Sequence, residues 1–374
     1  MRHITSGLVL ITLSLFAIEA FADHSPKKMM RNVKAYAQLS VTGKLGPFDV
    51  NYDKFGEIPN ASKTSVENKK FDKWLGDKFN LAAIVMRDGK VIYERYNKKR
   101  KIDSNTPLLG MSMSKTAIAA SVGGLLCSGK IKSLNDKAGS YSKFLASTPY
   151  GEVSIRNILQ MNSGVSPLGR SDEKRFNQKS RGMQKFDGNG NVREALNFYK
   201  SAARNAGQQM NYHSTDSLAL SILVEEIAQK SLAKYFHSEI YSQFGKSGFM
   251  QWTSDKSGTT VSFSDLVMTA QDWANFGQYL MRQKQSNSCL GRYFNEGVKK
   301  AVATGKKNRS KYGYQSWVFP VNGEAAMVLQ GHSGQFIVLD ETTNTLLLTI
   351  SVNEKYKVGN LFSDIGKITE RLSQ

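Results

Sequence analysis

Ser112–Gly129, which reads SMSKTAIAASVGGLLCSG, is the stretch of sequence that decides the fold. Ile118 and Val122 are four residues apart, and two leucines continue the same apolar face, so the stretch predicts a buried helix. Ser112 and Lys115 are three residues apart, a spacing that places two side chains on one face of a helix. The sequence therefore predicts a serine hydroxyl beside a lysine amine at the start of this helix.

Such a pair is suited to nucleophilic catalysis. A hydroxyl is a poor nucleophile until a neighbour takes its proton, and a partly buried lysine can do this or assist a second base. A helix N-terminus also offers backbone N–H groups to a developing negative charge. The same S-x-x-K spacing occurs at Ser25, Ser140, Ser171 and Ser231. Context favours Ser112, because it follows a predicted strand pair and opens an apolar helix.

Outward from this helix, strand patterns lie at both ends of the chain and helical patterns in the middle. Asp88-Gly89 joins two apolar runs, as is typical of a β-hairpin. The predicted strands are Leu81–Met86, Val91–Tyr96, Tyr312–Phe319, Phe336–Leu339 and Leu346–Val352, and the predicted helices include Ser217–Gln229, Ala270–Gln283 and Leu361–Leu372. This order predicts an α/β (α+β) fold, with one antiparallel sheet built from both ends of the chain, flanked by helices and interrupted by a mostly helical region.

Four parts are expected along the chain. Residues 1–22 predict a secretory signal, because Arg2 precedes an apolar run shorter than the roughly 20 residues of a membrane span, and Ala20-Phe21-Ala22 suits a signal peptidase. An N-terminal extension is expected at 23–60, the sheet domain at 61–130 plus 306–374, and the helical region at 131–305. The mature chain is expected to be exported, periplasmic or secreted, without a transmembrane segment.

Charge and cysteine content constrain partners and compartment. A formal net charge of +20 favours anionic surroundings such as wall polymers or acidic substrates. No nucleic-acid motif accompanies the charge, so nucleic acid is not an expected partner. The two cysteines, Cys127 and Cys289, leave two alternatives open. An oxidising compartment permits a disulfide, whereas the apolar surroundings of Cys127 equally suit a buried free thiol.

Two further segments match the Ser112 tetrad in order and character. Asn211–Ser214 reads NYHS, and Gly331–Gly334 reads GHSG. Together the three elements resemble the Ser-x-x-Lys, Tyr-x-Ser/Asn and Lys/His-Thr/Ser-Gly signatures of the β-lactamase and penicillin-binding-protein superfamily. The surrounding sequence resembles the class C β-lactamase-related branch, which also includes esterases, D-amino-acid peptidases and 6-aminohexanoate-oligomer hydrolases. The resemblance covers roughly residues 65–372.

The resemblance implies roles for individual residues. Ser112 would be the acylated nucleophile, with Lys115 sharing its proton network. Tyr212 would be the general base or proton relay, with its pKa lowered from near 10 by the lysine charge. Ser214 would hydrogen-bond this network. The remaining implied site residues are His332, Ser333 and Gly334 on a strand edge, and Gln335, whose backbone N–H would form an oxyanion hole with that of Ser112.

One position departs from the commonest family pattern. His332 stands where typical β-lactamases carry lysine, and histidine is mostly neutral at pH 7. The change favours an esterase, an amidase or a D-peptidase over an efficient β-lactamase. Ser333 does not fit a G-x-S-x-G nucleophile elbow, because Gln335 replaces the final glycine. Neither a metal site nor a cofactor is indicated, since no His or Cys spacing suits zinc and Asp187–Phe198 lacks the calcium-loop glycine and glutamate.

Three functions remain as hypotheses. The first is a serine hydrolase that forms a Ser112 acyl-enzyme with an ester, an amide or a D-amino-acid peptide, including one derived from the cell wall. The second is a D-alanyl-D-alanine carboxypeptidase or β-lactamase at the cell wall. The third is a catalytically silent wall-binding protein of the same fold. The loop near Ser166–Val192 is expected to set specificity, and the sequence does not fix the oligomeric state.

Overall fold

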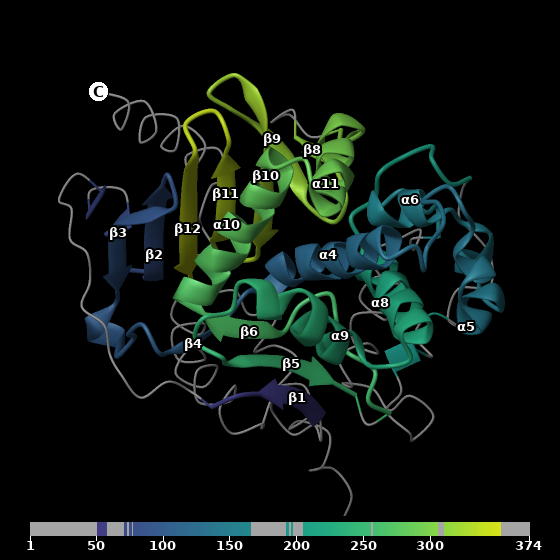
Figure 1. Ribbon diagram of the computed structural model, residues 1–374, viewed down its shortest axis with the longest axis horizontal. Coiled ribbons are helices and arrows are strands. Elements are labelled where there is room, and N and C mark those ends of the chain that lie inside the picture. The colour runs from purple at the N-terminus through teal and green to yellow at the C-terminus, as the bar shows by residue number, and fades with distance from the viewer. Residues whose placement is uncertain are drawn as a thin grey trace, which may run out of the picture.

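The computed structural model describes residues 51–57, 71–72, 75–76, 78–165, 192–193, 196, 205–255, 257–305 and 310–352. Within these residues an eight-stranded sheet and a four-stranded sheet enclose a group of helices (Figure 1). All the strand pairs are antiparallel. The predicted α/β class with an antiparallel sheet flanked by helices is confirmed.

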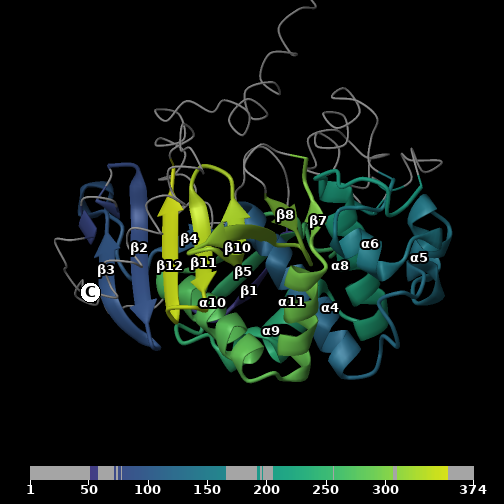
Figure 2. The same cartoon turned by 90° about the horizontal axis from the view of Figure 1, so that it is seen from above.

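The large sheet combines strands from both ends of the chain, as predicted. Its strands are β2 (Asn80–Arg87), β3 (Lys90–Tyr96), β7 (Val302–Ala303), β8 (Lys311–Tyr312), β9 (Trp317–Val321), β10 (Glu324–Gly331), β11 (Gln335–Asp340) and β12 (Thr345–Ser351). They follow the order β3-β2-β12-β11-β10-β9-β8-β7, and Figure 2 shows the first five side by side. The predicted strand Tyr312–Phe319 is in fact two strands, β8 and β9, separated by a turn.

Alternation along these strands buries both faces of the large sheet. Leu346 and Leu348 of β12 belong to the core on the side of the long helices, whereas Leu347 belongs to a second core on the opposite side. β11 alternates in the same way, with Ile337 on the helical side and Phe336 on the other. Burial on both faces explains why these strands read as nearly continuous apolar runs.

The hairpin of β2 and β3 forms where Asp88-Gly89 predicted it. Arg87 pairs with Lys90, leaving a two-residue loop between them. Asp88 has φ 50° and Gly89 has φ 75°, so both central residues lie in the left-handed region that such loops require. The sequence prediction of this hairpin is confirmed.

A small second sheet was not anticipated from the sequence. Its strands are β1 (Asn51–Phe55), β4 (Pro107–Leu109), β5 (Met250–Ser254) and β6 (Leu266–Thr269), in the order β1-β5-β6-β4. β1 comes from the segment expected to be a loose N-terminal extension. β5 and β6 come from the region expected to be mostly helical. All residues of β5 and β6 are buried, so neither strand shows the polar alternation that would have revealed it.

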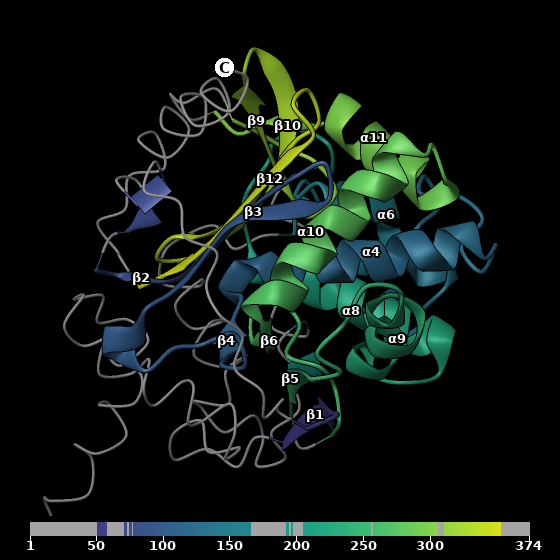
Figure 3. The same ribbon diagram turned by 60° about the vertical axis from the view of Figure 1, so that its left-hand side comes forward.

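The helices fill the space between the two sheets and beside them. They are α4 (Ser114–Cys127), α5 (Lys143–Ala146), α6 (Ile155–Leu159), α8 (Ser214–Ala228), α9 (Leu232–Glu239), α10 (Ala270–Gln285) and α11 (Cys289–Lys299), with short 3-10 turns at η1 (Lys98–Arg100), η2 (Met111–Met113), η3 (Ala138–Ser140), η4 (Pro149–Glu152) and η6 (Tyr241–Gln243). α10 lies against β2, β11 and β12, while α4 packs against α8, α9 and α11 (Figure 3). α4 is therefore a central helix, surrounded by other elements.

A disulfide joins the last residue of α4 to the first residue of α11. The Cα atoms of Cys127 and Cys289 are 5.8 Å apart and their sulfur atoms are bonded. This selects the disulfide over the free thiol that the sequence left open. The bridge fixes the end of α4 that lies away from the S-x-x-K tetrad.

Several sequence predictions fall outside the described residues. These are the secretory signal at 1–22, almost all of the loop near Ser166–Val192, and the final helix at Leu361–Leu372. Among the helices that the structure describes, none has the length and apolar character needed to cross a membrane.

Candidate active site

Ser112 lies on the 3-10 turn η2, immediately before α4, rather than within the α-helix that the sequence predicted. Met111, just before it, has φ 49°, a strained backbone conformation for a residue with a side chain. Ser114 secures the turn, because its hydroxyl donates to the carbonyl of Met111 at 2.7 Å and accepts from the N–H of Leu266 at 3.2 Å. The half-buried Ser112 is thus presented on a rigid turn anchored to β6.

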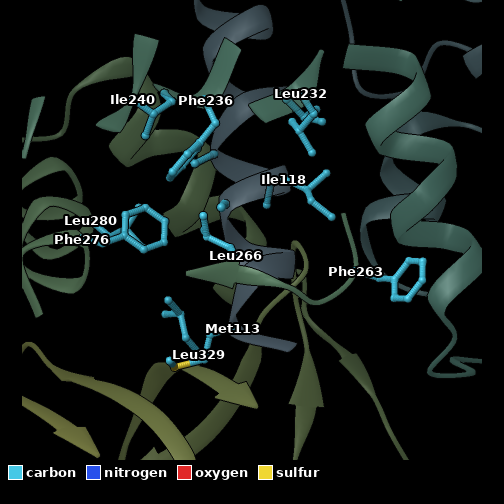
Figure 4. Close-up of a cluster of buried hydrophobic side chains, with 14 of the residues drawn as sticks. Met113, Ile118, Leu232, Phe236, Ile240, Phe263, Leu266, Phe276, Leu280 and Leu329 are labelled. Atoms are coloured by element: carbon cyan, nitrogen blue, oxygen red, sulfur yellow. The ribbon is translucent and has the colours of Figure 1, made fainter. Parts of the chain in front are cut away.

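Buried side chains of the hydrophobic core also pack against the turn that carries Ser112. Met113 is fully buried next to Leu329 of β10, and Ile118 lies one helical turn further into the cluster (Figure 4). Leu266 of β6 belongs to this cluster too. Because cores are close-packed, the residue after Ser112 has little freedom to move. The core therefore restrains the backbone from which the Ser112 side chain projects.

Lys115 lies beside Ser112, as the spacing predicted. Its amine is 3.2 Å from Ser112 Oγ and donates a hydrogen bond of 2.6 Å to the carbonyl of Phe263. It also lies 5.3 Å from the ring centroid of Tyr212, and the side chain is only 2 % exposed. The lysine that brings its amine to Ser112 is therefore buried and held by three different segments of the chain.

Tyr212 reaches the same place from the segment that precedes α8. Its phenol hydrogen-bonds Ser112, and its ring packs on Trp317 at 5.4 Å and edge-on against Tyr312 at 5.7 Å. Burial raises the pKa of Tyr212 to about 12, and the hydrogen bond with Ser112 opposes this only in part. The expectation of a lowered pKa is therefore not met, because burial of the phenol dominates and raises it.

The residues after Tyr212 start α8. His213 is buried and extended, and its Nδ1 accepts a hydrogen bond from the Thr215 N–H, capping the helix. Burial, aided by the charge of Lys115, lowers the pKa of His213 to about 3, so the imidazole is neutral. Ser214 is the first residue of α8, and in the described part of the chain it forms no hydrogen bond with Ser112 or Lys115. The expected hydrogen bond from Ser214 to the network is thus not formed.

The GHSG segment lies against the serine turn. Its His332, Ser333 and Gly334 form the tight turn between β10 and β11, rather than a strand edge, and His332 is exposed. A Cβ built on Gly331 would lie 2.5 Å from the Gly110 carbonyl oxygen. Only glycine allows β10 to approach the turn that carries Ser112 so closely.

Gln335, the first residue of β11, is brought near Ser112 by the same approach. It pairs with Gly331, and a Cβ on that glycine would lie 2.8 Å from Gln335 Cβ and 3.0 Å from Met111 Cβ. The backbone of Gln335 and that of the serine turn are therefore neighbours. This is the arrangement that an oxyanion hole between the two backbone N–H groups requires.

Gln315, which the sequence did not single out, connects the elements of the site. It lies in the turn between β8 and β9 with φ 51° and is buried. Its carbonyl accepts from the hydroxyl of Thr116 at 3.0 Å, and its side-chain oxygen accepts from Ser217 at 2.7 Å. Its amide nitrogen donates to the carbonyls of Ile158 and Leu159. One side chain and its carbonyl thus tie α4, α8 and α6 together.

The site contains no group of metal ligands in the part of the chain that the structure describes. What the arrangement offers is a hydroxyl on a rigid turn, a buried lysine, a protonated phenol and the backbone of Gln335 beside the serine turn. These are the parts needed for acyl transfer through a serine. The beta-lactamase family model matches residues 75–369, a span that contains the whole of this site. The chain belongs to the beta-lactamase family.

Solved structures of family-like proteins share the fold at low sequence identity. A protein from Bacillus anthracis described as a 6-aminohexanoate-dimer hydrolase is 20 % identical with a TM-score of 0.71, over 90 % of this chain and 94 % of that one. EstCE1, a hydrolase with promiscuous acyltransferase activity, is 11 % identical with a TM-score of 0.61, covering 80 % and 96 %.

A class C beta-lactamase in complex with cefoxitin is 14 % identical with a TM-score of 0.60, covering 81 % of this chain and 96 % of that one. Comparison with curated proteins found no significant match. At these identities the structural likeness shows the fold, and the neighbours' different printed activities leave the substrate of this beta-lactamase family member undecided.

Proposed function

We propose that this beta-lactamase family member is a serine hydrolase that cleaves ester or amide bonds through an acyl-enzyme on Ser112. The observation that carries the proposal is the meeting of three side chains from separate segments. Lys115 Nζ is 3.2 Å from Ser112 Oγ, and Tyr212 hydrogen-bonds the same hydroxyl. A nucleophile within hydrogen-bond reach of two proton-transfer groups is the signature of covalent catalysis.

In the proposed reaction, Ser112 Oγ attacks the substrate carbonyl carbon and its proton passes to the Lys115–Tyr212 pair. Because the pKa of Tyr212 is raised to about 12, its phenol stays protonated at neutral pH. It therefore acts as a relay that takes the serine proton while its own phenol proton moves to the leaving oxygen or nitrogen, so the pair gains no net proton. The pair then protonates the leaving alcohol or amine as the carbonyl–heteroatom bond breaks.

Deacylation repeats the step with water as the nucleophile. Water loses a proton to the same pair and attacks the ester carbonyl, and the proton returns to Ser112 Oγ as the acid product leaves. The oxyanion formed in both steps would be held by the backbone N–H groups of Ser112 and Gln335. No additional cofactor is required by this sequence of steps.

The substrate class follows from the third motif. His332 is exposed in the β10–β11 turn, where a lysine would supply a fixed charge for a substrate carboxylate. Histidine lacks the fixed charge of lysine, which suits an uncharged acyl group, as in simple esters and amides, or a D-peptide whose carboxylate is recognised elsewhere. Two structural neighbours, one described as a 6-aminohexanoate-dimer hydrolase and one as a family VIII carboxylesterase, agree with this preference.

The test is acylation and turnover by the parent protein, Ser112→Ala and Ser128→Ala. Ser128 is an exposed serine at the other end of α4 and serves as the matched control. We expect a fluorophosphonate to add one adduct to the parent and the control, seen by intact mass, and none to Ser112→Ala. Hydrolysis of a p-nitrophenyl ester should fall about 10⁴-fold in Ser112→Ala alone. Unchanged hydrolysis in a folded Ser112→Ala protein would refute the proposal.

A second candidate is a D-alanyl-D-alanine carboxypeptidase or β-lactamase acting at the cell wall after export. The penicillin-binding-protein and class C β-lactamase neighbours and the net charge of +20 favour it. Penicillin labelling of Ser112, with release of D-alanine from a wall peptide or hydrolysis of a chromogenic cephalosporin, would select it. Labelling by the fluorophosphonate alone would select the esterase or amidase. A folded protein that binds wall material and takes neither label would be the silent member.

A further inference from the structure

A cavity of about 490 Å³ opens at the outer edge of the large sheet, beside β3 and the 3-10 turn η1. Five of the side chains lining it are cationic: Lys78, Arg95, Lys98, Lys99 and Arg100. Among the lining residues that the structure describes, Asp72 and Glu94 are the acidic ones, so these described residues carry a net charge of +3. The volume lies within the range of roughly 300–1,000 Å³ that is typical of small-molecule sites.

The two carboxylates of this basic cavity are already engaged by neutral partners. Tyr93 donates its hydroxyl proton to Asp72 at 2.8 Å. Glu94 is buried and accepts from the Tyr96 hydroxyl and, at 2.7 Å, from the side-chain amide of Gln271. Neither acid therefore serves as the counter-ion of a lining lysine or arginine.

The five cations lack carboxylate partners among the residues that the structure describes. Arg95 donates to the carbonyl of Leu75 at 3.2 Å, and Lys78 lies over the Phe79 ring at 5.1 Å. The three residues of η1 are exposed and form no ion pair within those residues. Like charges gathered at one place repel one another, so the arrangement gains free energy when an anion joins it.

The basic cavity is separate from the proposed catalytic site. β3 is the outermost strand of the sheet, and β2 and β12 stand between it and β11, where the serine turn docks (Figure 1). Three strand spacings of about 4.8 Å place the two sites roughly 14 Å apart or more. An anion bound here would not touch Ser112 or Lys115.

We propose that the basic cavity binds a ligand that carries two or more phosphate groups. A single carboxylate would balance only one of the three excess charges, whereas a diphosphate or a phosphodiester segment matches them. Arg95 and Arg100 supply planar guanidinium groups that bind phosphate oxygens in pairs, and the lysines add compact charges. The ligand can be soluble, or it can be the headgroup region of an anionic lipid surface, which presents the same chemistry.

The test measures binding of inorganic diphosphate to the full chain by calorimetry at low salt. The site variant combines Lys98→Ala, Lys99→Ala and Arg100→Ala, which remove no buried side chain. The matched control combines Lys143→Ala, Lys234→Ala and Lys246→Ala, three exposed lysines elsewhere that change the net charge equally. Phosphatidylglycerol vesicles, with phosphatidylcholine vesicles for comparison, form the second arm and are assayed by co-sedimentation. p-Nitrophenyl ester hydrolysis and thermal melting report the fold of both variants.

We expect saturable diphosphate binding that weakens about tenfold or more in the site variant and stays within twofold in the control. Loss of vesicle binding in the site variant alone, without diphosphate binding, would also support the site and would identify a lipid headgroup as the ligand. Equal losses in the two variants would show a general effect of net charge and would overturn the proposal. The absence of saturable binding both to diphosphate and to vesicles would also overturn the proposal. If the site variant melts early, Arg100→Gln alone replaces it.

Discussion

Asp216, in the first turn of α8, should make the stability of this protein fall as pH rises from about 4 to about 7. Its side chain is completely buried, and Oδ1 accepts hydrogen bonds of 2.7 Å from both the Tyr150 hydroxyl and the Ser163 hydroxyl. Burial raises the pKa of Asp216 from 3.8 to about 7, although these hydrogen bonds act in the opposite direction. Tyr150 and buried Tyr312 are titratable groups that interact with it.

The direction and the size of this change in stability follow from the difference in proton binding between the native and unfolded states. Because the pKa is raised on folding, the unfolded state loses its proton near pH 4 while the native state keeps it until about pH 7. Between those values the native state binds more protons, so the free energy of unfolding decreases with pH. Three pH units at 1.36 kcal/mol each amount to about 4 kcal/mol over the whole interval, of which about 2 kcal/mol falls between pH 5 and pH 7.

Asp216→Asn tests this reasoning, because asparagine keeps the acceptor for both hydroxyls and does not titrate. Urea unfolding of the parent and the variant at several pH values from 5 to 8 shows how the free energy of unfolding of each protein depends on pH. We expect the parent to lose about 2 kcal/mol more than Asp216→Asn over pH 5 to 7. Asp88→Asn, which removes an exposed carboxylate in the β2–β3 turn, should follow the parent. If the free energy of unfolding depended on pH equally in the parent and in Asp216→Asn, the proposed role of Asp216 would be refuted.

Four further predictions concern the site and its supports. Tyr212→Phe keeps the ring packing but removes the relay, so kcat for a p-nitrophenyl ester should fall about 10²- to 10⁴-fold with little change in melting temperature. Gly331→Ala places a Cβ 2.5 Å from a backbone oxygen of the serine turn, and kcat/KM should fall about 10²-fold while the protein stays folded. Gln315→Ala leaves buried partners unsatisfied, and urea unfolding should show a loss of about 3 kcal/mol. Replacing Cys127 and Cys289 by alanine opens a loop with a sequence separation of 162, which costs up to about 5 kcal/mol in the chain-entropy model and is measured in the same way.

The sequence predicted those parts of the fold that have a local signal. The Asp88-Gly89 pair and the two strands beside it are enough to predict a hairpin turn. The spacing of apolar residues within α10 is likewise enough to predict a helix there. The closeness of Ser112 and Lys115 was predictable for the same reason, because three residues of chain fix it. The family resemblance then supplied Tyr212, which local reasoning could not have joined to Ser112 across 100 residues.

The parts that could not be predicted depend on tertiary contacts. β5 and β6 are buried on both faces, so they lack the alternation that identifies a strand. Lys115 donates to the carbonyl of Phe263, a backbone atom with no sequence signature. The pKa of Tyr212 was expected to be lowered by a charge, but burial decides it, and burial is a property of the folded molecule.

The placement of β12 has a consequence for synthesis of the chain. β12 (Thr345–Ser351) lies between β2 and β11 in the large sheet, and Thr345 faces Arg87 from 258 residues further along the chain. Contacts at such separation form late and slowly. A polypeptide that stops short of Thr345 contains every proposed catalytic residue, yet it leaves two strands without the neighbour that joins them. We therefore expect the proposed hydrolysis to appear only in chains that extend through β12, the last strand among the described residues.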